Sequence, residues 1–169
     1  VPSFKGHFCE ESIGECFVAL QKVDTVVLGP GLTGDFIEEE LVKELFETDE
    51  DIVADAGCLA HIANNHQFLQ RKEGHTILTP HAGELKVLLD SFGLESELEL
   101  AIQYNCYVVV KGQFTRIINP QGESCISSTG CSTLATAGSG DVLSGIIGAF
   151  VSCFDDFQAA IEAAVLVHG

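Results

Sequence analysis

The chain has 169 residues, 46% of them hydrophobic, which is sufficient for one domain with an apolar core. Its 8 Lys and Arg residues against 25 Asp and Glu residues give a formal net charge of −17, so we expect neither a nucleic acid nor a membrane as partner. The 7 cysteines include no C-x-x-C pair and lie mostly in apolar runs, so we expect reduced thiols, a cytoplasmic location and no structural zinc site.

From residue 25 onward, strand-like apolar segments alternate with helix-like segments. Strands are predicted at residues 25–28, 52–54, 76–78 and 106–110, and helices at residues 36–46, 59–63, 84–89 and 97–104. Asp35 is expected to cap the first of these helices, whereas the acidic segment before residue 25 shows no clear pattern. Because the strands are apolar throughout, the pattern favours a mostly parallel sheet covered by helices on both faces.

The last third of the chain departs from this alternation. The segments "FTRII" and "ESCIS" flank a Pro-containing turn at residues 119–122 and predict a β-hairpin at the edge of the sheet. Helices are predicted at residues 142–154 and 157–168, and the first of them is shorter than the roughly 20 residues of a membrane span. We therefore expect residues 1–169 to form one α/β domain.

Unusual turns follow the predicted strands. They are the segments Gly29-Pro30-Gly31, Asp55-Ala56-Gly57, "TPHAGE" at residues 79–84 and Lys111-Gly112. Ligands of open α/β sheets gather at the carboxyl ends of the strands, so these turns mark a candidate site. A phosphate ligand would need backbone amides, a lysine or a metal ion to offset the negative charge of the chain. The sequence has no G-x-x-x-x-G-K-[ST] motif, so a nucleotide would be held in another way.

The stretch "LATAGSGDVLSGIIGAF" at residues 134–150 joins a glycine-rich turn to an apolar helix. In one interpretation the glycines only let the helix start close to its neighbours, and Asp141 complements the helix dipole. In the other, the amides of residues 138–141 form an anion hole for a phosphoryl group, and Asp141 takes the proton of an attacking hydroxyl. Similar alternatives hold for His81, a loop histidine or a ligand contact, and for Lys111, a surface lysine or a phosphate contact.

The ordered set of segments resembles the NAD(P)H-hydrate dehydratases of the ribokinase-like superfamily. The resemblance is carried by "GPGL", "DAG", "TPHAGE", "KG", "LATAGSGDVLSGIIGAF" and the terminal "AVLVHG". It implies a ribokinase-like three-layer α/β/α sandwich and a repair enzyme that uses ADP or ATP, with Mg²⁺, to dehydrate hydrated NADH or NADPH. The family phosphorylates the ring hydroxyl and then eliminates phosphate. A homo-oligomer is also implied, fused to or working with an epimerase domain.

The resemblance also implies roles for individual residues. Asp141 would be the base at the substrate hydroxyl, and the hydrated dinucleotide would further contact Gly31, His81 and Glu84. The nucleotide and its transferred phosphate would be held by Lys111, Gly112, Gln113, Phe114, Thr115, Thr136, Gly138, Ser139 and Gly140. No protein metal ligand is assigned.

The chain departs from the family pattern at four positions. Gly57 replaces an acidic residue, Cys131 replaces an asparagine, and Thr33 and Ala137 replace frequent glycines. The glycine-rich strand turn and helix with which the family begins do not precede Val1, so we expect a domain incomplete at its N-terminus. Two alternative functions stay open, namely a small-molecule kinase of the same superfamily and a non-catalytic nucleotide-binding module.

Overall fold

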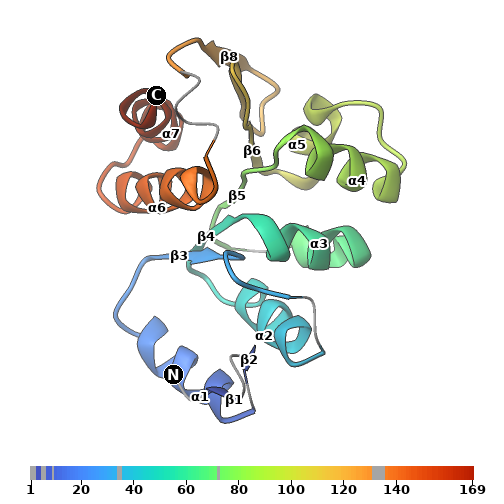
Figure 1. Ribbon diagram of the computed structural model, residues 1–169, viewed down its shortest axis with the longest axis vertical. Helices are drawn as coiled ribbons and strands as arrows, with labels where there is room; N and C mark the ends of the chain where they lie inside the picture. The colour runs from blue at the N-terminus through green and yellow to red at the C-terminus, as the bar shows by residue number, and fades with distance from the viewer. Residues whose placement is uncertain (1–2, 5–6, 9, 34–35, 72, 131–135) are drawn as a thin grey trace.

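The computed structural model describes residues 3–4, 7–8, 10–33, 36–71, 73–130 and 136–169. Its centre is a six-stranded sheet in which the strands lie side by side in chain order (Figure 1). The strands are β3 (Thr25–Leu28), β4 (Asp51–Ala54), β5 (Thr76–Leu78), β6 (Tyr107–Val110), β7 (Thr115–Ile118) and β8 (Ser124–Ser127). The pairs from β3 to β6 are parallel, whereas β7 and β8 are antiparallel to their neighbours and form the expected hairpin at the edge. Two short strands, β1 (Ser3–Phe4) and β2 (His7–Phe8), pair separately.

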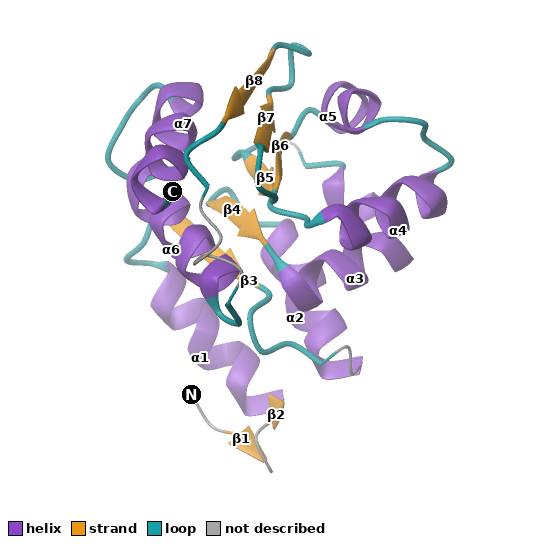
Figure 2. Ribbon diagram, turned by 45° about the horizontal axis from the view of Figure 1, so that its top comes forward, coloured by secondary structure: helices purple, strands orange, loops and turns teal. Residues whose placement is uncertain are grey.

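Helices cover both faces of the sheet, as Figures 1 and 2 show. They are α1 (Glu10–Leu20), α2 (Phe36–Phe46), α3 (Ala56–Asn64), α4 (Ala82–Phe92), α5 (Glu97–Tyr104), α6 (Ser139–Val151) and α7 (Phe157–His168), with a 3₁₀ turn at His66–Leu69. Helices α2 to α5 lie on one side, and α6 and α7 lie side by side on the other. The expected three-layer α/β/α arrangement is confirmed.

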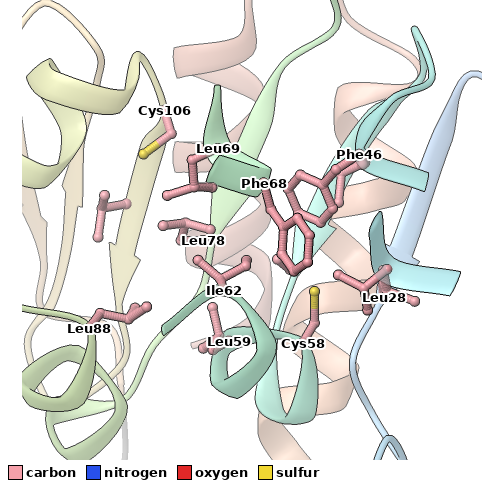
Figure 3. Packing of buried hydrophobic residues seen from close by; sticks show 14 of the residues in the cluster. Leu28, Phe46, Cys58, Leu59, Ile62, Phe68, Leu69, Leu78, Leu88 and Cys106 are labelled. Atoms are coloured by element: carbon pink, nitrogen blue, oxygen red, sulfur yellow. The ribbon is translucent and has the colours of Figure 1, made fainter. Parts of the chain in front are cut away.

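Apolar residues of the central strands supply both faces of the sheet. Ile52 and Ala54 pack into the larger core cluster under α2 to α5, part of which is drawn in Figure 3. Val53, between them, packs into a second cluster with Leu143 of α6 and Ala164 of α7. Successive side chains of a strand point to opposite faces, so a strand buried on both sides must be apolar throughout.

Several helix boundaries differ from the predicted ones, and at α3 and α4 the reason is a side-chain cap that starts the helix before the apolar periodicity begins. Helix α3 starts directly after its cap Asp55, and α4 starts after its cap His81. Helix α6 begins at Ser139, three residues earlier than predicted, and ends at Val151. Helix α1 was not predicted at all, although Ile13, Cys16 and Phe17 pack against the larger cluster. The predicted cap Asp35 lies outside the described residues.

The described cysteines are free thiols, as expected, but they are not uniformly buried. Cys58 and Cys106 are fully buried, whereas Cys153 is exposed. Burial raises the pKa of Cys106 to about 12, so this thiol stays protonated and unreactive.

Within the described part of the chain, every helix is too short or too polar to cross a lipid bilayer.

Candidate functional site

The carboxyl ends of the parallel strands converge on Asp55, which follows β4 and is fully buried. Its Oδ1 accepts a hydrogen bond of 2.8 Å from the backbone N–H of Ala56, and its Oδ2 accepts one of 2.5 Å from Ser144 Oγ. Oδ1 also accepts a short hydrogen bond from Lys111 Nζ, which forms an ion pair. Asp55 therefore links β4, the end of β6 and helix α6.

The backbone around Asp55 is unusually tight. A Cβ atom on Gly29, whose φ is +129°, would lie 1.7 Å from the carbonyl oxygen of Asp55, so the "GPG" turn packs directly on this residue. Ala56 has a φ of +44°, a left-handed conformation that costs a non-glycine residue about 1–2 kcal/mol. Strain of this kind persists where surrounding contacts fix it, often at functional sites.

Two opposing effects act on the ionisation of Asp55. Burial is the largest single effect and favours the neutral carboxyl, but hydrogen bonds from Lys111, Ser144 and the Ala56 amide favour the carboxylate. Together the hydrogen bonds and the charge of Lys111 outweigh the effect of burial, and the pKa of Asp55 lies below its usual value. Asp55 is thus an anion at neutral pH, and it anchors the cationic head of Lys111.

Glu84 and His81 form a second group beside Lys111. Glu84 Oε2 lies 4.0 Å from Lys111 Nζ and accepts a 2.8 Å hydrogen bond from the backbone N–H of His81. His81 Nδ1 accepts hydrogen bonds from the amides of Gly83 (3.0 Å) and Glu84 (3.1 Å), which completes a capping box at the start of α4. Because Nδ1 accepts, the neutral ring carries its proton on Nε2, which lies 3.6 Å from Glu84 Oε1.

Helix α6 begins without a side-chain cap from any described residue. Its N-cap residue is Gly138, with a φ of +86°, and the Ser139 amide donates to the carbonyl of Thr136 at 3.2 Å. A Cβ atom on Gly140 would lie 3.2 Å from Lys111 Nζ, so the ammonium group reaches the first turn of the helix. The first amides of a helix lack intrahelical partners and carry a partial positive charge. The lysine and the helix end together favour an anion here.

A cavity of about 660 Å³ opens beside this anion-binding position. Such a volume is in the range of small-molecule sites, roughly 300–1,000 Å³. It is lined by His81, Lys111, Gly112, Gln113, Thr115, Thr129, Gly130, Thr136, Ser139, Gly140, Leu143, Val165, His168 and Gly169. Gly130 allows its loop to approach the 112–113 turn, because a Cβ atom there would lie 3.0 Å from the Gln113 carbonyl oxygen.

The structure brings most of the predicted nucleotide residues together. The predicted residues that line the cavity are Lys111, Gly112, Gln113, Thr115, Thr136, Ser139 and Gly140, together with His81. Phe114, 57% exposed, and Gly138 do not line it. Glu84 contacts Lys111 instead. Asp141 lies in the first turn of α6 next to Gly140, is exposed and does not line the cavity, and Gly31 is exposed as well.

The structure accounts for two of the departures from the family pattern. A Cβ atom on Gly57 would lie 2.4 Å from the carbonyl oxygen of Leu32, so a larger residue does not fit against this turn. The hydroxyl of Thr33, which a glycine lacks, lies 3.2 Å from both carboxylate oxygens of Glu38 and donates to that carboxylate, and this contact ties the turn to helix α2. Ala137 is exposed, and Cys131 lies outside the described residues.

Sequence reasoning missed part of the site. The sequence pattern indicates Asp55 only as part of a turn, and it does not indicate Ser144 or Thr79. Ser144 and Thr79 are fully buried, and their hydroxyl oxygens lie 3.4 Å apart. A buried serine one helical turn after Gly140 was the available signal, because a hydroxyl in an apolar face requires a partner. His168 was seen only as part of the terminal "HG".

The comparison with known proteins agrees with this geometry. A sequence model of the NAD(P)H-hydrate dehydratases matches residues 6–169. The chain belongs to this family. The bifunctional NAD(P)H-hydrate repair enzyme Nnr of Thermofilum pendens is 34% identical over 157 residues, which cover 86% of this chain and 29% of that protein. The ADP-dependent (S)-NAD(P)H-hydrate dehydratase of Bacillus subtilis is 32% identical over 151 residues, covering 85% of this chain and 53% of that protein.

Solved structures place this dehydratase-family chain in the ribokinase-like fold. The ADP/ATP-dependent NAD(P)H-hydrate dehydratase of Bacillus subtilis, co-crystallised with ATP/Mg²⁺ and soaked with CoA, matches 86% of this chain and 55% of its own, with 32% identity and a TM-score of 0.72. A ribokinase from Thermotoga maritima matches 88% of this chain and 50% of its own, with a TM-score of 0.63, and at 18% identity it shows the fold alone. The chain spans about half the length of the Bacillus dehydratase and less than a third of the Thermofilum enzyme.

Proposed function

We propose that this chain holds the nucleotide and the transferred phosphate in an ADP- or ATP-dependent NAD(P)H-hydrate dehydratase, an enzyme that repairs nicotinamide cofactors. The observation that carries the proposal is the position of Lys111, held by Asp55 against the uncapped first turn of α6, at one end of a cavity of about 660 Å³. This arrangement provides local positive charge in a chain whose net charge is −17.

In this proposal the cavity binds the nucleoside part of ADP or ATP beside the 112–115 turn, and the terminal phosphates reach Gly140 and Lys111. Phosphoryl transfer asks a protein mainly for positioning and charge stabilisation. Amides of the first turn of α6 and the ammonium of Lys111, which lies 3.2 Å from where a Cβ atom on Gly140 would stand, are proposed to supply both.

Asp141 is proposed as the base that removes the proton from the ring hydroxyl of the hydrate. The support for this role is the position of Asp141 next to Gly140, which lines the nucleotide cavity, whereas Asp141 itself is exposed and does not line it. The hydroxyl oxygen would attack the terminal phosphorus, and the phosphoanhydride bond would break to release AMP from ADP or ADP from ATP. The resulting phosphate ester would lose phosphate and a ring proton to form the carbon–carbon double bond of NADH or NADPH. His81, which is exposed and lines the cavity, is proposed as a further contact of the hydrate.

The described residues are assigned no ligand of Mg²⁺ in this proposal. They contain no group of three or more His, Cys, Asp or Glu residues able to hold a metal ion. Near the cavity, the Lys111 ammonium already contacts Asp55 and lies 4.0 Å from Glu84. A Bacillus subtilis relative was co-crystallised with ATP/Mg²⁺, so we propose that any Mg²⁺ arrives on the nucleotide phosphates, and no step is assigned to it.

Location and partners belong to the same proposal. We propose a cytoplasmic homo-oligomer that works with an epimerase, either as a fused domain or as a separate protein. The free thiols among the described cysteines support the first point, and relatives named as bifunctional repair enzymes support the association with a second activity.

The proposal is tested by incubating the purified protein with NADH hydrate and ADP or ATP. We expect the absorbance of NADH to return only when nucleotide is present, with release of inorganic phosphate. A stable phosphoester without phosphate release would indicate a kinase instead. Nucleotide binding without any product would favour the non-catalytic module.

A further inference from the structure

The last residue of helix α7 contacts the first turn of α6. His168 Nε2 lies 3.0 Å from the carbonyl oxygen of Ser139 and 3.1 Å from Ser139 Oγ. Both residues line the cavity. The two helices lie side by side on one face of the sheet, as Figure 2 shows, and they share the apolar cluster that contains Leu143 and Val165. The contact therefore joins two elements whose packing is fixed elsewhere along their length.

The chemistry of the two oxygens fixes the direction of this contact. A carbonyl oxygen can only accept a hydrogen bond, so His168 Nε2 carries the proton and donates it. The carbonyl of Ser139 and the N–H of Gly140 belong to one planar peptide group. A donor that holds this carbonyl therefore also fixes the direction of the Gly140 N–H, which lies at the cavity end of the helix.

The first turn of α6 has no side-chain cap among the described residues, so its free amides are held only by the helix backbone and by outside contacts. Its N-cap is a glycine in a left-handed conformation, and no described side chain caps it. Glycine offers the backbone the widest choice of conformations, so a hydrogen bond from α7 adds a constraint at the start of this helix. Gly169 lets the end of α7 lie close to Thr129, because a Cβ atom on Gly169 would lie 2.2 Å from Thr129 Oγ1.

We propose that His168 is a positioning residue of the phosphate site. It holds the Ser139–Gly140 peptide group so that the Gly140 amide points at the phosphate of the bound nucleotide, and it polarises that amide through the carbonyl. The inference rests on the proposed nucleotide site and adds to it a residue that contacts the protein backbone rather than the ligand.

The test compares ADP with adenosine, which lacks the phosphates. In the His168→Phe variant, a ring remains but the donor is lost, so we expect ADP to bind about 3- to 10-fold more weakly, the effect of one hydrogen bond. Adenosine affinity should not change. The His168→Gln variant retains an amide donor of similar reach and should recover most of the ADP affinity. Binding is measured by calorimetry.

A matched control addresses the packing of α7. His75 stacks on Phe157 at the other end of this helix, with ring centroids 4.0 Å apart, and it does not line the cavity. His75→Phe should leave the affinities for ADP and adenosine unchanged. If His168→Phe leaves the ADP affinity unaltered, or lowers the adenosine affinity equally, the proposed role of His168 is wrong. The proposed function is not affected by either result. A failure of the unsubstituted protein to bind ADP would overturn the proposed function and this inference with it.

Discussion

The ammonium group of Lys111 contacts the fully buried carboxylate of Asp55. The lysine follows β6 and the aspartate follows β4, so the pair spans the intervening strand β5 at the carboxyl edge of the sheet. Only 17% of the Lys111 side chain is exposed, and the same ammonium reaches Gly140 in α6. The pair therefore stabilises the edge of the sheet and also holds a positive charge at the proposed phosphate site.

Replacing Lys111 with Met should lower the free energy of unfolding by about 3–5 kcal/mol, because it leaves the buried Asp55 without its cation. The double variant Asp55→Asn, Lys111→Met should be less destabilised than Lys111→Met alone, since neither charge then remains buried. Urea unfolding measures both. Lys86→Met is the control for loss of an exposed lysine. Equal stabilities of the Lys86 and Lys111 variants would show that the buried pair contributes nothing.

The stability of the protein should depend on pH through Asp55. The folded pKa of this carboxyl lies below its unfolded value, because the hydrogen bonds from Lys111, Ser144 and Ala56 outweigh the opposing effect of burial. The stabilisation is therefore fully present above the unfolded pKa, about pH 4, and it is lost as the pH falls through the lower folded value. Unfolding measured between pH 7 and pH 3 should show a smaller acid loss in Asp55→Asn. Identical slopes in the two proteins would refute this assignment.

The two glycines of the "GPG" turn should respond differently to alanine. At Gly29 the new Cβ atom would lie 1.7 Å from the Asp55 carbonyl oxygen, so the turn or β4 must move, and we expect a loss above about 3 kcal/mol or no folded protein. At Gly31 no atom lies within 4 Å, and only the positive φ of +84° opposes the change, at about 1–2 kcal/mol. Denaturant midpoints give the comparison. If Gly31→Ala loses as much stability as Gly29→Ala, the clash with the Asp55 carbonyl oxygen makes no difference, and backbone strain alone accounts for both losses.

The layered fold could be predicted from the sequence because its signals are local. The strands at 25–28 and 76–78 and the helices at 97–104 and 157–168 have the predicted bounds, since each is an apolar run between clear turn or capping residues. Helix α1 was not predicted, although Ile13, Cys16, Phe17 and Leu20 recur at the spacing of one helix face and pack in or against the larger cluster.

The candidate site could be predicted only in part. The turn at 111–115 and the start of α6 were found because glycines beside a lysine and an aspartate are unusual after strands. The Asp55–Lys111–Ser144 network was missed because its members are far apart in the sequence and meet only through the order of the strands. The exposure of Asp141 depends on the orientation of α6, which no local pattern specifies.

The central claim is that Asp141 acts in catalysis and not in nucleotide binding. The most direct measurement is the rate of NADH recovery from its hydrate by Asp141→Asn, with ADP affinity measured in the same preparation and Asp90→Asn as the control for an exposed carboxylate. We predict a rate at least about 100-fold lower, the usual contribution of a general base, with unchanged ADP affinity. A variant that keeps the full rate would contradict the account.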